Sequence, residues 1–387
     1  MSMNWLKRCI RVVLSISLCA LPAYAAAQSS GTFKIGSFLS LTGPTAFLGD
    51  PEEKTLRQYV EKANAAGGVA GRKIELVVYD DGGEANRSRT LVSRLIDEDK
   101  VDIIIGGSLS GGSMAVIPII EESKIPYISL ASAISITEPV RSWVFKTPLT
   151  DRMVCEKIYE EMKQRGIRRI GMLSSSYGYG QSMQKECRAQ NAKFGIEWLA
   201  DETYGPRDTD MTAQLTTISR KPGIQAVLNT GFGQTGAIVT RNFAQLGIKV
   251  PLYQSSGVAS DEFLKLAGAA ANGIRFAGSS LVVADQLPAS DPVKPVLAAY
   301  IKEYTERWKI PASLFGGYTY DALAIAFDAL KRANSTDKAR IRAAIEQTKN
   351  LVGTSGIYNM TPQDHNGLSY SSLSMIEISG GKFMLAK

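Results

Sequence analysis

The chain is poor in the side chains that most often carry out acid–base or metal chemistry. It contains one histidine, His365, and four cysteines in 387 residues, and these do not recur at the spacings of a metal site. Ser108 and Ser110 do not stand in the G-x-S-x-G pattern that exposes a catalytic serine. His365 lies in "TPQDHNG", where a solvated loop residue is the simplest interpretation. The sequence therefore predicts a protein that is not an enzyme.

The chain also lacks an apolar run long enough to cross a bilayer. The run "VVLSISLCAL" near its start is too short for a membrane span. It lies between three basic residues and a tail of small residues, an order that is typical of a secretory signal peptide. We predict a signal peptide over residues 1–27, with cleavage after Ala27 and with Ala25 as the second choice. The mature protein would then be exported.

Charge of one sign is not concentrated in any part of the chain. There are 44 Lys and Arg residues against 37 Asp and Glu residues, and cleavage of the signal peptide would remove three of the basic ones. The remaining charges are dispersed, without the basic stripe and interleaved aromatic residues of a nucleic-acid-binding surface. A nucleic-acid partner is therefore not expected.

Two cysteines, Cys155 and Cys187, lie beyond the predicted signal peptide, and both fall in helical patterns. In an oxidising compartment they could form a disulfide bond. Their spacing along the chain does not show whether their Cα atoms are close enough. A disulfide and two half-buried free thiols therefore remain equal alternatives.

What the chain has in abundance is a repeated order of apolar strand, Gly/Ser/Thr-rich loop and amphipathic helix. "VDIII" (residues 101–105) precedes "GGSLSGGS" and a helical pattern, and Asp50 with Pro51 predicts the start of another helix. Strands that alternate with helices form parallel sheets covered on both faces. There are too many such units for one sheet of ordinary size. We therefore predict an α/β fold with two doubly wound parallel-sheet lobes.

The rhythm restarts after about Thr147, which divides the chain between the two lobes. We assign residues 28–147 and 276–356 to the N-terminal lobe, and residues 148–275 and 357–387 to the C-terminal lobe. In this arrangement the late helices return to the first lobe, and the last strands complete the second.

Six polar loops follow the expected parallel strands, and parallel strands bring such loops to one edge of a sheet, where ligands of open α/β folds bind. Glycine lets backbone N–H groups approach a ligand closely, helix starts offer N–H groups to an anion, and hydroxyls add hydrogen bonds. The loops read "LSLTGPTAF", "GSLSGGS", "LASAIS", "SSSYGYG", "NTGFGQTG" and "QSSGVAS". They predict a shared cleft for a small carboxylate.

One of these loops also fits a different function. Gly231, Gly233 and Gly236 in "GFGQTG" match the dinucleotide-binding fingerprint. Such a site also needs an acid about 20 residues later, at the end of the next strand. That strand ends in "LYQSS", which contains no acid. A tight strand-to-helix turn is the simpler interpretation, and no cofactor is expected.

Several longer segments resemble a known family. They are "IGSFLSLTGPTAFLGD", "NAAGGVAGRKIELVVYDD", "VDIIIGGSLSGGSMAVIPIIEESKIPYIS", "YGYG" and "SSGVAS". The chain resembles the type I periplasmic solute-binding proteins of ABC importers, of the branched-chain amino acid (Leu/Ile/Val) binding-protein family. The resemblance implies a periplasmic monomer whose two lobes, joined by a three-crossing hinge, close on a solute. It implies docking on an inner-membrane ABC permease, although a ligand-sensing module of a regulator stays open.

The resemblance also implies a set of binding residues. The carboxylate would be held by two loops, the apolar body would lie against aliphatic and aromatic side chains, and one second-lobe position would face the ligand's substituents. These residues are Ser110, Gly111, Gly112, Ser113, Leu130, Ala131, Ser132, Phe47, Leu48, Tyr177, Phe232 and Ser256.

The chain departs from the family at Ser256, where amino-acid binders offer an acid to the ligand's ammonium group. A buried ammonium without a counter-charge costs on the order of 3–5 kcal/mol, more than the about 1.5–3 kcal/mol of one charged hydrogen bond. We therefore predict an aromatic or other apolar acid without an amino group. A branched-chain or other amino acid or amide remains the alternative, because Asp81 could supply the missing acid, although we favour a structural role for Asp80 and Asp81.

Overall fold

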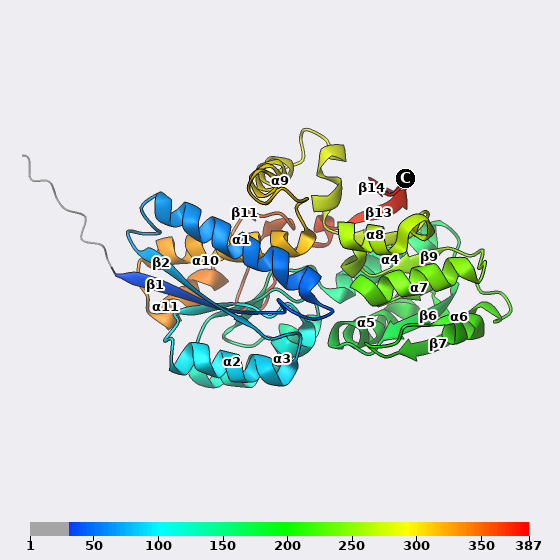
Figure 1. Cartoon of the computed structure of the whole chain (residues 1–387), viewed down its shortest axis with the longest axis horizontal. Coiled ribbons are helices and arrows are strands. Elements are labelled where there is room, and N and C mark those ends of the chain that lie inside the picture. Colours follow the sequence, from blue (N-terminus) through cyan, green and yellow to red (C-terminus); the bar gives the residue numbers. More distant parts are fainter. Residues whose placement is uncertain (1–30, 387) are drawn as a thin grey trace, which may run out of the picture.

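The computed structural model describes residues 31–386, so the predicted signal peptide lies outside the described residues. Two α/β lobes lie side by side, each built on its own sheet (Figure 1). Within residues 31–386, helices that combine the length and the apolar character of a membrane span are absent. The prediction of two parallel-sheet lobes is confirmed.

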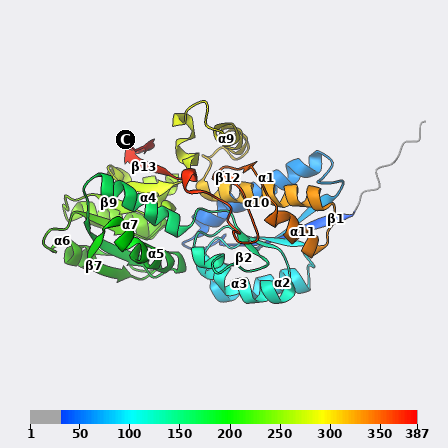
Figure 2. The same ribbon diagram turned by 180° about the vertical axis from the view of Figure 1, so that it is seen from behind.

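The first lobe has a five-stranded parallel sheet in the order β2-β1-β3-β4-β5. The strands are β1 (Thr32–Leu39), β2 (Lys73–Asp80), β3 (Ile103–Gly106), β4 (Tyr127–Ser129) and β5 (Val144–Lys146). The helices are α1 (Ala46–Ala65), α2 (Ala85–Asp97), α3 (Ser110–Ser123), α9 (Lys294–Trp308), α10 (Leu314–Ala333) and α11 (Lys338–Glu346). Figure 2 shows α10 and α11 beside the first sheet, although they are far from it in sequence.

The second lobe has a seven-stranded sheet in the order β14-β13-β10-β9-β8-β6-β7, with β13 antiparallel to both of its neighbours, β10 and β14. The strands are β6 (Arg169–Ser175), β7 (Glu197–Tyr204), β8 (Ala226–Asn229), β9 (Leu252–Gln254), β10 (Arg275–Gly278), β13 (Ser374–Ser379) and β14 (Lys382–Leu385). The helices are α4 (Asp151–Gln164), α5 (Gly178–Phe194), α6 (Thr212–Ser219), α7 (Gly233–Gln245) and α8 (Asp261–Ala267).

The chain passes between the two lobes three times: from β5 to α4, from β10 back toward α10, and from β12 (Ile357–Tyr358) to β13. Before the last passage, residues 361–366 lie against the first sheet. Lys146 donates its backbone N–H to the carbonyl of His365 at 3.1 Å, and the Asn366 amide donates to the Lys146 carbonyl at 3.2 Å. We propose that the second lobe's share of this stretch begins after these residues rather than at residue 357.

His365 is not the solvated loop residue that the sequence suggested. Its side chain is 1% exposed and stacks on Phe145 with ring centroids 4.2 Å apart. Nδ1 lies 2.8 Å from the Val144 carbonyl, and Nε2 lies 3.3 Å from a Glu346 carboxylate oxygen. The prediction was wrong because the loop docks beside β5, a long-range contact that local sequence does not encode.

α1 also begins earlier than predicted, at Ala46 rather than at Asp50. Pro51 therefore lies inside the helix, where its missing N–H leaves the carbonyl of Phe47 without the usual helical donor. The early start places Phe47 and Leu48 on the first turn of the helix, at the sheet edge where the six loops meet.

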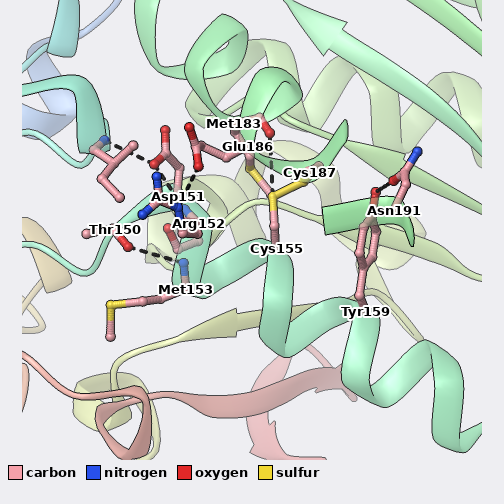
Figure 3. The surroundings of a disulfide bond; sticks show 12 residues. Thr150, Asp151, Arg152, Met153, Cys155, Tyr159, Met183, Glu186, Cys187 and Asn191 are labelled. Atoms are coloured by element: carbon pink, nitrogen blue, oxygen red, sulfur yellow. Dashed lines mark hydrogen bonds and ion pairs between the residues drawn. A yellow bond between two sulfur atoms is a disulfide. The ribbon is translucent and has the colours of Figure 1, made fainter. Parts of the chain in front are cut away.

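Cys155 and Cys187 form a disulfide bond between α4 and α5 (Figure 3). Their Cα atoms are 5.2 Å apart, and both side chains are fully buried. One turn further along α4, Tyr159 donates to the Asn191 side-chain oxygen of α5 at 3.0 Å. The bond settles the alternative that the sequence left open, and it joins α4, which follows the hinge, to α5, whose first turn reaches the cleft.

Candidate functional site

A pocket lies between the lobes, at the edge where helices of both lobes begin. Its empty volume is about 440 Å³, including space that is open to solvent. The lining residues are Leu48, Ser108, Leu109, Ser110, Leu130, Ala131, Ser132, Tyr179, Phe232, Ser256, Gly257, Phe315 and Tyr318. The first turns of α1, α3, α5 and α10 all contribute, as does the residue before α7.

The first lobe offers N–H groups at the start of α3. Residue Ser113 is the first whose N–H reaches a helical carbonyl, that of Leu109 at 2.9 Å. The N–H groups of Ser110, Gly111 and Gly112 therefore precede the intrahelical ladder. They lie at the positive end of the helix, which favours an anion. The Ser110 hydroxyl accepts the N–H of Ala133 at 3.2 Å, which ties α3 to the loop after β4.

The two loops that the sequence predicts to hold a carboxylate are only partly turned toward the pocket. Ser110 lines it, as do Leu130, Ala131 and Ser132. Ser113 points into the lobe, where its hydroxyl donates to the Gly107 carbonyl at 3.2 Å and accepts from Tyr127 and Ser129 at 2.9 Å each. Gly112 faces α2, since a Cβ there would stand 2.8 Å from the Ser88 hydroxyl. Of the four candidates of α3, only Ser110 therefore lines the pocket, whereas Gly111 lies opposite Gly178 of α5 and Gly112 and Ser113 face the lobe interior.

The first turns of α3 and α5 approach each other across the cleft. A Cβ on Gly178 would lie 3.1 Å from the backbone nitrogen of Gly111 and 3.3 Å from its Cα. Around a Cβ on Gly111, by contrast, the space within 4 Å is open. The two lobes are thus closed over the pocket, and Gly178 stands at a point of close backbone approach.

The apolar wall differs in detail from the predicted one. Phe47 does not line the pocket but packs on two residues that do, with ring centroids 6.4 Å from Phe232 and 5.7 Å from Phe315. Tyr177 is half-buried and packs against Phe232, with ring centroids 5.0 Å apart and the rings tilted by 42°. Tyr179, two residues later, is the tyrosine that lines the pocket. Leu48 and Phe232 line it.

Sequence reasoning missed Ser108, Leu109, Tyr179, Gly257, Phe315 and Tyr318. Four of these stand in the very loops that were singled out, so a wider choice of residues in each loop could have included them. Phe315 and Tyr318 belong to α10, which follows no strand. The sequence predicts that this segment returns to the first lobe, but no local pattern predicts that these two side chains reach the cleft.

The second lobe contributes two neighbouring hydroxyls. Ser256 begins the turn after β9, and its hydroxyl lies 3.4 Å from that of Tyr179. Ser255 fixes this turn by donating to the Gly231 carbonyl at 2.6 Å and accepting from Gly257 N–H at 3.2 Å. Burial raises the pKa of Tyr179 above its usual value. The pair is therefore uncharged at neutral pH.

None of the residues that line this pocket carries a charge in the described chain. Asp81 is 1% exposed, and its carboxylate accepts from the Ser40 hydroxyl at 2.9 Å, from Gly83 N–H at 2.8 Å and from the Ser88 hydroxyl at 2.8 Å. It is thus engaged in the turn after β2. Glu52 lies beneath the pocket, where it accepts from the Ser108 hydroxyl, and burial raises its pKa well above the usual range.

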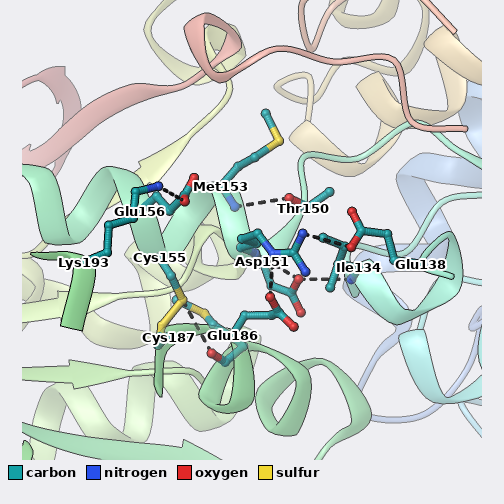
Figure 4. Close-up of polar contacts among 12 residues, drawn as sticks. Ile134, Glu138, Thr150, Asp151, Met153, Cys155, Glu156, Glu186, Cys187 and Lys193 are labelled. Atoms are coloured by element: carbon teal, nitrogen blue, oxygen red, sulfur yellow. Dashed lines mark hydrogen bonds and ion pairs between the residues drawn. A yellow bond between two sulfur atoms is a disulfide. The ribbon is translucent and has the colours of Figure 1, made fainter. Parts of the chain in front are cut away.

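A buried lysine lies behind the loop after β4. Lys146 of β5 is fully buried and donates its Nζ to the carbonyl of Ser132 at 2.5 Å. Burial lowers its pKa to about 7, against the opposing effect of Asp151. Figure 4 shows Asp151 at the start of α4, where it accepts the N–H of Ile134 at 3.0 Å.

Arg152, the next residue, joins the two lobes at the hinge. It pairs with Glu138, after the fourth strand of the first lobe, at 2.9 Å and with Glu186 of α5 at 2.7 Å. Through Arg152, the first turn of α4 is therefore bonded to both lobes beside the hinge.

The glycines of "GFGQTG" are explained by close packing. A Cβ on Gly231 would collide with the Tyr204 hydroxyl, and one on Gly233 would collide with the Phe47 ring. Gly233 also has φ of +51°, which favours glycine. These contacts support a tight turn and require no phosphate.

Comparison with known proteins finds relatives that share this architecture. A family model described as periplasmic binding protein matches residues 32–382. The chain is 23% identical over 381 residues to Leu/Ile/Val-binding protein homolog 3 of Brucella melitensis, covering 97% of this chain and 99% of that one.

Solved structures have the same fold. An extracellular ligand-binding receptor from Rhodopseudomonas palustris HaA2 matches with a TM-score of 0.86 and 30% identity, over 92% of this chain and 99% of that one. A solute-binding protein of an ABC transporter from Rhodopseudomonas palustris BisB5, solved with 3,4-dihydroxybenzoic acid, matches with a TM-score of 0.79 and 21% identity, over 91% and 95% of the two chains.

Proposed function

The chain belongs to the periplasmic binding protein family, and from this premise we propose that it is the substrate-binding subunit of an ABC importer for an apolar carboxylate without an amino group. Members of this family capture small molecules in the periplasm and do not catalyse reactions. The specific ligand class is our inference from the pocket. The alternative, a branched-chain amino acid, draws on the name of the Brucella relative.

One observation carries the choice of ligand: the pocket presents helix starts and hydroxyls but no charged side chain. Helix N-termini stabilise an anion without a fixed positive charge. The same pocket has nothing to neutralise an ammonium group, since Asp81 is engaged elsewhere and Glu52 is covered by Ser108. The uncompensated charge of an amino acid would therefore weaken its binding by on the order of 3–5 kcal/mol.

We assign the carboxylate to the first-lobe side of the pocket. The N–H groups of Ser110 and Gly111 and the hydroxyls of Ser110 and Ser132 are its proposed donors. Gly112 and Ser113 would act only by shaping the helix start, because they face the lobe interior. The body of the ligand would lie against Leu48 and Phe232, with Phe47 and Tyr177 as support for the aromatic wall.

The second lobe makes closure depend on the ligand. Phe232, Ser256 and Tyr179 reach the pocket from the second lobe, so a solute bound to the first lobe gains these contacts only when the lobes shut. A ligand shifts a two-state equilibrium by its difference in affinity for the two states. The closed form would be the one that the permease recognises.

Calorimetric titration of matched pairs tests the proposal. The pairs are 4-methylpentanoate with L-leucine and 3-phenylpropanoate with L-phenylalanine, each pair differing by one amino group. We expect the amine-free acid to bind at least about tenfold more tightly in one pair. Ser110→Ala should weaken that binding more than Ser113→Ala does, since Ser113 lies on the core side of the same helix and shapes only the helix start. Tight binding of leucine with no binding of either amine-free acid would refute the assignment and favour the amino-acid alternative.

A further inference from the structure

Four hydroxyl groups line one side of the pocket, and we refer to Ser132, Tyr318, Tyr179 and Ser256 as the hydroxyl arc. They come from four separate elements: the loop after β4, α10, α5 and the turn after β9. The side chains of Tyr318 and Ser132 interact, and the hydroxyls of Tyr179 and Ser256 lie 3.4 Å apart. The arc thus begins at Ser132 in the first lobe, continues through Tyr318 of α10 in the same lobe, and ends at Tyr179 and Ser256 in the second lobe.

The rest of the pocket wall is largely apolar. Its apolar residues are Leu48, Leu109, Leu130, Ala131, Phe232 and Phe315. A ligand in this pocket therefore contacts both apolar side chains and hydroxyl groups. The proposed carboxylate site occupies only the Ser132 end of the arc, which leaves Tyr318, Tyr179 and Ser256 for another part of the ligand.

The hydroxyls of Tyr179 and Ser256, beyond the carboxylate end, are only loosely paired with each other. A separation of 3.4 Å is at the long limit for two hydroxyls, whose preferred distance is about 2.7–2.8 Å. Tyr179 is 8% exposed, Ser256 4% and Tyr318 2%, so closure over an oxygen-free ligand would leave them with little water. Burying a hydroxyl without a good partner is unfavourable.

We infer that the natural ligand carries, besides its carboxylate, an uncharged oxygen on its apolar body that the hydroxyl arc binds. This inference rests on the proposed function and specifies its substrate class: apolar monocarboxylates with a hydroxyl or oxo substituent. Three features fit this class: each arc hydroxyl can donate or accept, the arc is neutral, and the remaining wall is largely apolar. An ammonium group would meet acceptors here but no counter-charge.

The test is a titration of acids that differ by one oxygen. The parent acids are benzoate and 3-phenylpropanoate, and the oxygen-bearing acids are 4-hydroxybenzoate, 2-hydroxy-3-phenylpropanoate, 2-oxo-3-phenylpropanoate and 3-(4-hydroxyphenyl)propanoate. For the wild-type protein we expect at least one oxygen-bearing acid to bind about tenfold more tightly than its parent, as one added buried hydrogen bond allows.

Three variants locate the effect: Tyr179→Phe, Ser256→Ala and Tyr318→Phe each remove one hydroxyl. In at least one of them the preference for the oxygen-bearing acid should fall to about threefold or less. Tyr304→Phe is the matched control, because the Tyr304 hydroxyl is buried without a partner in a cluster around α9, away from the pocket. The preference should be unchanged there. Thermal unfolding of each ligand-free variant identifies any that fails to fold, and the remaining variants then decide.

The outcomes separate the two proposals. If a parent acid binds and no oxygen-bearing acid binds better, the inference is wrong while the proposed function stands. The inference is equally wrong if the preference survives in every folded arc variant. If no acid of either kind binds, the proposed function is wrong, and the inference falls with it.

Discussion

Replacing Gly178 by alanine is expected to hinder closure of the lobes without harming the lobes themselves. Gly178 begins α5 and has an ordinary negative φ, so alanine is locally acceptable there. In the closed structure, however, the new Cβ would stand 3.1 Å from the Gly111 nitrogen and 3.2 Å from the Met114 Cε. Ordinary van der Waals contact begins at 3.4 Å. The methionine side chain can turn away, but the Gly111 backbone can retreat only if α3 moves.

The magnitude follows from that overlap of a few tenths of an ångström. Overpacking of this kind costs about 1–3 kcal/mol, and the cost falls on the closed state alone, because the open state separates α3 from α5. Ligand affinity should therefore drop about 5- to 150-fold. The stability of the ligand-free protein should stay the same or rise by up to about 1 kcal/mol, as expected for glycine to alanine at a compatible site.

Two measurements on Gly178→Ala check this reasoning. Calorimetric titration gives the affinity for the tightest acid of the panel, and small-angle scattering shows whether that acid still makes the protein more compact. Gln181→Ala, an exposed change in the same turn of α5, serves as the control. Wild-type affinity together with wild-type compaction in Gly178→Ala would refute the claim that α3 and α5 meet at this point when ligand is bound.

Three further perturbations have definite expected outcomes. Lys146→Met should remove a pH dependence of the folding stability. Burial lowers the pKa of Lys146 to about 7 from its ordinary value of 10.5, so between these two pH values the unfolded chain binds more protons than the folded one. The stability of the wild type relative to the variant should therefore rise with pH across that window. Thermal unfolding of both proteins at pH 6–10 checks this, and parallel curves of stability against pH would contradict it. The acids that act on Lys146 are Asp151, Glu138 and Asp364. Reduction of the Cys155–Cys187 disulfide should lower the free energy of unfolding by about 2–4 kcal/mol, measured by denaturant titration with the Cys155→Ser/Cys187→Ser double variant as control; an unchanged midpoint would show that the bond contributes nothing. Asp81→Asn should cost about 1–3 kcal/mol of stability, because a buried carboxylate with three hydrogen bonds is disturbed, but it should leave the preference between amine-free and amino acids unchanged; a changed preference in titration would place Asp81 in the ligand site.

The sequence was sufficient for the architecture because the relevant signals are local and repeated. A buried run such as "VDIII" followed by a glycine-rich loop and a helix predicts one strand–loop–helix unit, and many such units predict doubly wound sheets. The edge at which the pocket lies follows from the same topology. Ser110, Ser132, Phe232 and Ser256 were placed near the pocket because each stands at the end of such a unit.

What the sequence could not give depends on angles and on distant parts of the chain. Ser110 and Ser113 differ by less than one helical turn, yet one lines the pocket and the other bonds to the Gly107 carbonyl. In the same way, Tyr179 lines the pocket, whereas the sequence predicted Tyr177. Tyr318 and Lys146 reach the site only because α10 and β5 pack behind it, and neither carries a local mark of ligand binding.

The electrostatics of the cleft follow a consistent physical order. One acid and one lysine lie one layer behind the wall: Glu52 under Ser108, and Lys146 under the Ser132 carbonyl. A charge in the wall itself would have to be desolvated each time the lobes close, and this desolvation is unfavourable. Neutral donors avoid that cost and still favour an anion through their orientation, since fixed N–H dipoles need no reorganisation. A cleft built in this way can discriminate against an ammonium group without any repulsive contact, because the missing counter-charge alone supplies the penalty.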